Sequence, residues 1–323
     1  MTKTNETGSA TANREIAITR IFNAPRELVY EVWTDPQHID KWWGPNGFTN
    51  DTRQMDVRPG GMWRFLMKGP EGMQFPSRIV YTEVVKPERL VFEHGSDTDN
   101  DPDRFHVTVT FTAVSDRQTQ VHMSMLFPTA AQRDMVVEKY GAIEGNRQTM
   151  DRLEEHLAAL SLPAFALVRV VDAPCDLVFR AWTEPERLAQ WWGPRGFGMQ
   201  TQKIDLRPGG VYLYSMTSPE GFRMWGKMAY REVVAPRKLS FVVSFSDGNG
   251  GTTRHPMSET WPLEVLNSIT LEEQDGKTLM TLKGWPLTGD QTERDTFNAG
   301  FDSMQQGFAG TLSQLDAYLA AQQ

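Results

Sequence analysis

Apolar residues follow two different spacings along the first part of this chain, and each spacing predicts a different kind of element. Residues 14–23 alternate between apolar and polar side chains, with Ile16 and Ile18 on one face, which predicts a half-buried strand. Residues 25–34 repeat apolar side chains at helical spacing, and a second short helix is predicted through Ile39. Strand-like segments follow at residues 49–57, 62–68, 74–85, 89–94, 105–114 and 119–127.

A long helical segment at residues 130–160 closes this series. Met150, Leu153, Leu157 and Leu160 form one apolar stripe. Gly141 and Gly145 weaken the first part, which we expect to be a separate segment. An antiparallel sheet of about seven strands has one face to bury. The long helix is the element best placed to cover that face.

The whole order then returns in the second half of the chain. The segment WWGPNGF at residues 42–48 recurs as WWGPRGF at residues 191–197, an offset of 191 − 42 = 149. The offset holds without a gap from residues 25–92 to residues 174–241, where 29 of 68 positions are identical. Two copies with a period of domain size indicate a duplicated domain and not a solenoid. We therefore predict domains at residues 14–161 and 163–323.

The second copy departs from the first in one long segment. Residues 247–262 form a segment that is longer than its counterpart in the first copy and rich in glycine and proline. We expect a flexible tip at residues 248–251. A hairpin is predicted to pair residues 267–272 with residues 277–283. One final helix is then predicted at residues 291–321, with apolar residues at heptad-like steps.

Composition narrows the class of protein. The 323 residues carry a net charge of −8, which argues against binding to nucleic acid or to an anionic membrane surface. No apolar run approaches the ~20 residues of a membrane span, so we expect no membrane insertion. Residues 1–13 are polar, lack the apolar core of a secretory signal, and are expected to have no regular structure. The single cysteine, Cys175, fits a reducing compartment, and we predict a cytoplasmic protein.

Four features in this order carry a resemblance to a known family. They are a proline after the first strand, the WWGP loop, an RPGG turn at residues 58–61 and 207–210, and a P-x-R/K-L strand at residues 87–90 and 236–239. The chain resembles the bacterial homologues of the activator of the heat-shock-protein-ninety ATPase. These belong to the START-like, polyketide-cyclase and birch-pollen-allergen superfamily. The resemblance covers both copies.

The resemblance implies an α+β fold made of two helix-grip domains. Each would be a curved antiparallel sheet of about seven strands wrapped around a long C-terminal helix, with two short helices at one end. Superfamily members include lipid and hormone carriers, cyclases, hydroxylase subunits and the chaperone activator, so the family motifs specify a fold more than an activity. No residue matches a catalytic motif of the family.

Three functions remain open on these grounds. The first is binding of a small hydrophobic or amphipathic molecule in a cavity between the sheet and the C-terminal helix. The second is interaction with a chaperone or another protein. The third is a cyclase- or hydrolase-type enzyme that uses carboxylates or tyrosines such as Tyr81 and Tyr230 as general acid or base. We favour the first and expect no enzyme activity.

Most candidates to line such a cavity are aromatic residues that recur in the two copies. The full candidate set is Trp42, Trp43, Phe48, Trp63, Arg78, Tyr81, Trp191, Trp192, Phe197, Tyr212, Trp225, Lys227 and Tyr230. The alternative for the tryptophan pairs is that one member of each pair belongs to the core, since Trp is highly buried on average. Arg78 and Lys227 align in mid-strand and either hold a ligand carboxylate or point outward, the commoner placement for a cation.

Other polar residues give weaker indications. Asp56 and Arg58 recur as Asp205 and Arg207, and a salt link in a hairpin is a more common role for such a pair than acid–base chemistry. The six histidines show no metal-ligand spacing, and residues 154–156 do not match the zinc-protease helix motif. The sequence therefore predicts no catalytic residues, no metal and no cofactor.

Overall fold

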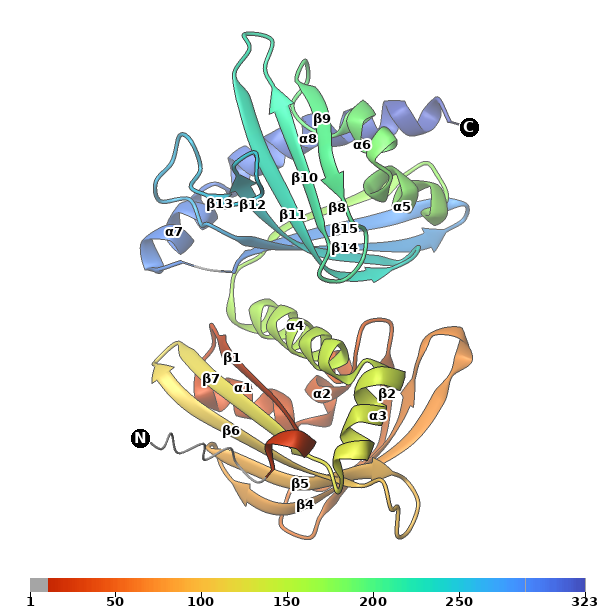
Figure 1. Ribbon diagram of the computed structural model, residues 1–323. Coiled ribbons are helices and arrows are strands. Elements are labelled where there is room, and N and C mark those ends of the chain that lie inside the picture. The colour runs from red at the N-terminus through yellow and green to blue at the C-terminus, as the bar shows by residue number, and fades with distance from the viewer. Residues whose placement is uncertain (1–10, 288, 323) are drawn as a thin grey trace, which may run out of the picture. The chain divides into compact units, whose positions relative to one another are not determined.

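A computed structural model describes residues 11–287 and 289–322 of the chain. These residues fold as two compact units that divide between Ser161 and Leu162. Figure 1 shows that each unit consists of its own sheet and its own helices. The two units, named here the first and second copy, are described separately.

The first copy contains seven strands, four α-helices and two short 3-10 turns within its described residues. The α-helix α2 begins after Asp35, whose carboxylate accepts a hydrogen bond from the Gln37 backbone N–H at 2.7 Å. In chain order the elements are η1 (Ala12–Arg14), β1 (Glu15–Phe22), α1 (Arg26–Thr34), α2 (Pro36–Trp42), β2 (Thr49–Met55), β3 (Met62–Lys68), η2 (Pro70–Gly72), β4 (Gln74–Val85), β5 (Arg89–Ser96), β6 (Phe105–Ser115), β7 (Gln118–Leu126), α3 (Ala130–Tyr140) and α4 (Ala142–Ser161).

The second copy repeats this order of strands and α-helices, has neither of the two 3-10 turns in its described residues, and adds one two-residue strand. Its elements are β8 (Phe165–Val171), α5 (Cys175–Thr183), α6 (Pro185–Trp191), β9 (Gly198–Ile204), β10 (Val211–Thr217), β11 (Arg223–Val234), β12 (Lys238–Ser246), β13 (Thr252–Thr253), β14 (Val265–Gln274), β15 (Lys277–Pro286), α7 (Gln291–Ala299) and α8 (Phe301–Ala320).

Both sheets are antiparallel and have the same topology. The first has the order β1-β7-β6-β5-β4-β3-β2, and the second has β8-β15-β14-β12-β11-β10-β9 with β13 paired to β12. The registers match as well: Ile79 lies opposite His94 in the first copy, and Met228 lies opposite Val243 in the second. The offset of 149 residues therefore relates positions in space and not only in sequence.

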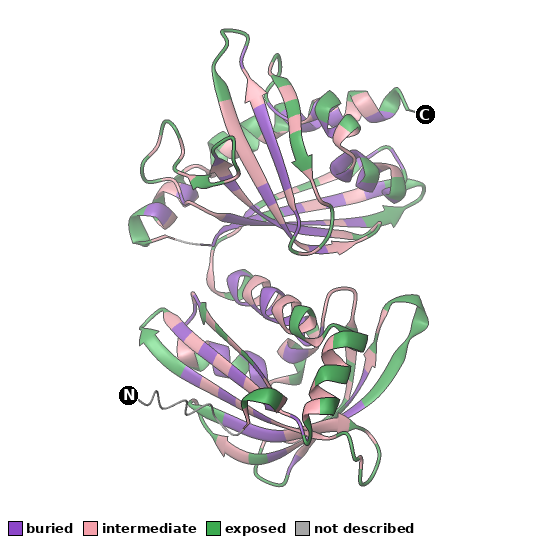
Figure 2. Ribbon diagram, viewed as in Figure 1, coloured by how far each residue is buried: buried purple, intermediate pink, exposed green. Residues whose placement is uncertain are grey.

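The C-terminal helix of each copy packs on one face of its sheet, named here the inner face. Met150, Leu153 and Leu157 of α4 belong to the same core as Trp63 and Tyr81 of the first sheet. The second copy has the equivalent core between α8 and its sheet, built on Leu312, Leu315 and Leu319. Figure 2 shows the resulting alternation of buried and more exposed residues along the strands. The predicted α+β helix-grip fold with a tandem repeat is confirmed.

The C-terminal helical segment is interrupted in both copies, although the sequence predicted a break only in the first. Gly141 separates α3 from α4 and adopts a left-handed backbone with φ of 61°. In the second copy α7 ends at Gly300, and α8 begins at Phe301. A Cβ at Gly300 would lie 3.3 Å from the ring of Trp261, because the inserted segment packs against this point.

That inserted segment, residues 247–262, has a defined conformation. The Asp247 carboxylate accepts hydrogen bonds from the backbone N–H groups of Asn249 and Gly251 at 2.8 and 2.9 Å. Trp261 packs on Phe297 of α7 with ring centroids 5.4 Å apart. We expected a flexible tip because of the glycine content of residues 248–251. In the structure the Asp247 side chain holds this turn through hydrogen bonds to its backbone. Of residues 1–13, for which no regular structure was expected, residues 1–10 lie outside the described residues and Ala12–Arg14 form η1.

Candidate functional site

The RPGG turn fixes the backbone of one inner-face tyrosine in each copy. Gly60 donates a hydrogen bond to the Tyr81 carbonyl at 2.8 Å, and the Tyr81 N–H donates to the Gly61 carbonyl at 3.0 Å. A Cβ on Gly61 would lie 2.2 Å from the Asp56 carbonyl oxygen, so no larger residue fits there. Gly209 and Gly210 make the same two bonds to Tyr230, at 2.8 and 2.9 Å.

The WWGP loop is held by a polar side chain from the C-terminal helix. Arg152 of α4 donates to the carbonyl oxygens of Gly44 and Pro45 at 2.8 and 3.0 Å. In the second copy Gln314 of α8 donates to the Gly193 carbonyl at 2.8 Å. The loop and the helix are therefore tied together at the same point of both copies.

The two tryptophans of each pair have different environments. Trp42 and Trp191 are almost wholly buried, and their indole N–H groups donate to the carbonyls of Val32 and Ala181, each at 3.0 Å. They are core residues. The second member of each pair extends farther along the inner face: Trp43 packs on Trp63 with centroids 5.6 Å apart. Trp192 is half-buried and lies 6.3 Å from Phe308 of α8.

Phe48 and Phe197, one residue beyond the second glycine of each loop, are half-buried. Phe48 stacks on Phe75 at a centroid distance of 6.1 Å, and the Phe75 side chain is exposed. A Cβ on Gly69 would lie 2.8 Å from the Phe48 ring, so this ring lies directly on the hairpin backbone. Apolar surface thus reaches solvent beside the WWGP loop.

The inner face of the first copy is aromatic. Trp63 stacks on Phe65 at 4.0 Å, and its indole N–H donates to the Thr52 hydroxyl at 2.8 Å. Tyr81 is buried on the neighbouring strand β4, and burial raises the pKa of its phenol. His94 of β5 lies against Phe105, with ring centroids 5.0 Å apart. This packing removes water from the imidazole and lowers its pKa to about 4, despite an opposing effect of Asp101.

The inner face of the second copy is richer in phenols. Tyr212 and Tyr214 occupy the positions of Trp63 and Phe65 and stack at 5.0 Å. Tyr212 shares a hydrogen bond of 3.2 Å with the Thr201 hydroxyl. Tyr230 lies on the next strand, β11, and is only 1% exposed. Burial raises the pKa of all three phenols, to about 12 for Tyr212, so they are neutral hydrogen-bond donors at pH 7.

Three candidate residues lie on the opposite, outer face of the sheets. Along β4 the buried residues are Ser77, Ile79 and Tyr81, so Arg78 points to the other side. Trp225 and Lys227 of β11 lie on the outer face for the same reason, since they alternate with Met228 and Tyr230. The sequence shows that these residues alternate with apolar ones along each strand. It does not show which of the two faces of the sheet the C-terminal helix covers.

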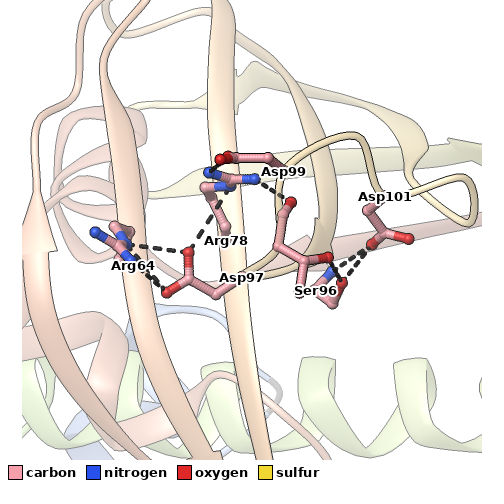
Figure 3. Close-up of polar contacts among 7 residues, drawn as sticks. Arg64, Arg78, Ser96, Asp97, Asp99 and Asp101 are labelled. Atoms are coloured by element: carbon pink, nitrogen blue, oxygen red, sulfur yellow. Dashed lines mark hydrogen bonds and ion pairs between the residues drawn. The ribbon is translucent and has the colours of Figure 1, made fainter.

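On the outer face these cations hold a loop. The Arg78 guanidinium lies 3.0 Å from Asp99 and 3.8 Å from Asp97, and Arg64 pairs with both oxygens of Asp97, as Figure 3 shows. In the second copy Lys227 donates to the Gly250 carbonyl at 3.0 Å and to the Thr252 hydroxyl at 2.9 Å. Both aligned cations therefore bind the segment that follows the next strand.

We expect Arg78→Ala to loosen residues 96–101 without unfolding the first copy. The Arg78 side chain is 15% exposed, but its partner Asp99 is 92% exposed and Asp97 keeps its pair with Arg64, so the loss should cost about 1 kcal/mol and shift the thermal transition by only a few degrees. Amide hydrogen exchange should become faster at residues 96–101 and stay unchanged on the inner-face strands. Lys227→Ala is the matched variant and should act on residues 247–252 alone. Faster exchange at Tyr81 would contradict this assignment.

The remaining polar candidates have structural partners. Asp56 pairs with Arg58 at 2.8 Å and Asp205 with Arg207 at 3.0 Å, so both are local salt links where the RPGG turn begins. Within residues 11–287 and 289–322 no three His, Cys, Asp or Glu side chains are grouped as a metal site would require. No helix in the same residues is long and apolar enough to cross a membrane.

Sequence reasoning missed three inner-face residues: Phe65, His94 and Tyr214. The signal for two of them was available, because Trp63 and Phe65 alternate by two residues, as do Tyr212 and Tyr214, which places each pair on one face of a strand. His94 follows Phe92 by two residues in the same way. Its contact with Phe105 depends on the pairing of β5 with β6, which no local pattern specifies.

Solved structures of single-domain proteins resemble one copy at a time. A protein from Nitrosomonas europaea is 26% identical, with 46% of this chain and 97% of that chain covered and a TM-score of 0.42. A Mycobacterium smegmatis protein is also 26% identical, with 49% and 91% covered and a TM-score of 0.40. The di-domain aromatase/cyclase BexL of the BE-7585A biosynthetic pathway matches 95% of this chain and 98% of its own at 14% identity, with a TM-score of 0.43. None of the curated proteins compared matches the chain.

The sequence signature of one family matches both copies. Residues 23–158 and 172–320 each match the family described as activator of Hsp90 ATPase homolog 1-like protein. The two matches include both WWGP loops, both RPGG turns and both C-terminal helices. Together they span most of the chain, and so this protein belongs to the activator of Hsp90 ATPase homolog 1-like family, whose domain it contains twice.

Proposed function

We propose that each copy binds a small hydrophobic or amphipathic molecule between the inner face of its sheet and its C-terminal helix. The domains carrying this activity would be residues 14–161 and 163–323. The lining would include Trp43, Trp63 and Tyr81 in the first copy, and Trp192, Tyr212 and Tyr230 in the second. Phe48 and Phe197 would lie at the entrance. Arg78, Trp225 and Lys227 are left out because they lie on the outer face.

One observation carries this proposal: the aromatic interior of each copy continues into half-buried aromatic side chains. In the first copy these are Phe48 and Phe105, and in the second they are Trp192 and Phe308. Apolar side chains that keep part of their surface in water forgo about 25 cal/mol for each Å² left uncovered. An apolar ligand that covers them recovers this free energy, and such surfaces commonly mark binding sites.

The test uses two apolar probes, 1-decanol and 2-methylnaphthalene, added to the full chain during thermal unfolding. A ligand that binds only the native state raises its stability by about 2.7 kcal/mol at a concentration of 100 Kd. We expect at least one unfolding transition to rise with probe concentration. Phe308→Ala should weaken probe binding to the second copy, whereas Trp225→Ala, a half-buried aromatic on the outer face, should not. Transitions that neither probe moves would contradict the proposal.

A second candidate function is interaction with a protein partner such as the Hsp90 chaperone. It is favoured by the exposed apolar residues at the β3–β4 and β10–β11 hairpins, where Met73, Phe75 and Phe222 are between 41% and 51% exposed. A partner surface of this kind would be tested by the ATPase rate of purified Hsp90 at saturating protein. An unchanged rate would exclude this function.

With a single cysteine, Cys175, the chain suits a reducing compartment, and we propose the cytoplasm.

A further inference from the structure

The two copies have different numbers of phenols at three aligned inner-face positions, of which two differ and one is a tyrosine in both. Trp63, Phe65 and Tyr81 in the first copy correspond to Tyr212, Tyr214 and Tyr230 in the second. The first copy thus has one phenol where the second has three. The backbone around them is the same, because the same RPGG turn holds Tyr81 and Tyr230 and the same strand pairing positions the other two.

The Tyr230 hydroxyl has no hydrogen-bond partner among the described residues, although the side chain is only 1% exposed. Tyr230 belongs to the same buried core as Tyr212 and Tyr214. A buried hydroxyl without a partner has lost its hydrogen bonds to water and gained none in return, which is unfavourable. Native structures seldom tolerate this cost without a compensating partner.

An apolar lining extends from these tyrosines. Trp192 packs against the buried core that contains Tyr214, and from Trp192 a series of aromatic rings follows, each within 6.3 Å of the next. The series runs through Trp192, Phe308, Phe165, Phe301, Phe297 and Trp261. Trp261 belongs to the inserted segment that only the second copy has. The phenols therefore form one polar end of an otherwise aromatic interior.

From this arrangement we infer that the second copy, and not the first, binds an aromatic or acyl compound through a neutral carbonyl oxygen that accepts a hydrogen bond from Tyr230. The inference rests on the proposed function and adds the chemical class of the ligand. A neutral acceptor fits because the phenols are donors and the nearby cation Lys227 is on the outer face, bonded to Gly250 and Thr252. A carboxylate would be buried there without a cation, which is costly.

The test compares two probes of nearly equal shape, 2-acetylnaphthalene and 2-isopropenylnaphthalene, which differ by a carbonyl oxygen in place of a methylene group. Binding to the full chain is measured by isothermal titration calorimetry. We expect the acetyl probe to bind more tightly, and Tyr230→Phe to lower its affinity about tenfold, which is the effect of losing one hydrogen bond. The affinity of the isopropenyl probe should not change.

Tyr81→Phe is the matched control, since it removes the aligned phenol of the first copy and should leave the tighter binding intact. Tyr230→Phe should also keep or raise the thermal stability of the unliganded chain, because it removes an unpaired hydroxyl and no bond. Equal affinities for the two probes, or equal losses in the two variants, would overturn the inference and leave the proposed function standing. Failure of both probes to bind would overturn both.

Discussion

Lowering the pH from 7 to 5 is expected to destabilise the first copy by about 2 kcal/mol through His94 alone. Packing against Phe105 and neighbouring rings lowers the pKa of this imidazole to about 4. In the unfolded chain its pKa is near 6.5. Between these two values the unfolded state binds a proton that the folded state does not, so protonation favours unfolding. The contribution of neutral His94 to the stability of the first copy is fully present above about pH 6.5 and is lost as the pH falls toward 4.

A second histidine of the first copy acts in the same direction. His156 of α4 lies 3.1 Å from His38 of α2, ring nitrogen to ring nitrogen. Burial, together with the nearby His38 and Lys41, lowers its pKa to about 4. Like His94, this ring is half-buried. At the aligned place in the second copy, Arg187 donates to the Tyr318 hydroxyl at 2.8 Å, a contact between two groups that do not titrate in this range.

Thermal unfolding at pH 7 and pH 5 checks this prediction, because the transition of the first copy should fall farther than that of the second. His94→Val installs the residue that the second copy has at the aligned position, Val243, and should remove most of the difference. The second copy has its own histidine with a lowered pKa, His255, so a small shift is expected there too. A variant that remains as acid-sensitive as the parent would contradict the assignment to His94.

Trp42→Ala and Trp191→Ala should each destabilise one copy by about 3–5 kcal/mol. Each removes a buried indole together with its hydrogen bond to a carbonyl of the preceding helix, in α1 or α5. Partial collapse of the surrounding side chains recovers only part of the lost contact. Because the stability of a domain is about 5–15 kcal/mol, either variant brings its own copy close to unfolding.

Chemical denaturation followed by circular dichroism measures both effects, and the transition of the unchanged copy serves as an internal reference. Phe222→Ala is the control, since this aromatic side chain is 51% exposed and its loss should change stability by less than about 0.5 kcal/mol. A Trp42→Ala variant as stable as this control would show that the indole is not a core residue.

The two copies share their loops and turns but differ in some side chains on the inner faces of their sheets. Both WWGP loops and both RPGG turns are repeated, and a helix side chain donates to the carbonyl of the first loop glycine in each copy, Arg152 to Gly44 and Gln314 to Gly193. Part of the inner face differs: His94 lies against Phe105 where the second copy has Val243, and Tyr214 replaces Phe65. The loop and turn motifs are therefore the same in both copies, whereas some of the side chains on the inner face differ.

The sequence by itself determined the repeat, the order of elements, the strand positions of the first copy and the role of the glycines. These follow from local periodicity and backbone sterics, which a few consecutive residues specify. It also indicated that one Trp of each pair is structural. Only the tertiary structure decided that Trp42 and Trp191 are those residues, that Arg78 and Lys227 lie on the outer face, and that His94 and Tyr214 lie on the inner one. Which face of a strand is covered depends on helices far along the chain, and no spacing within the strand carries that information.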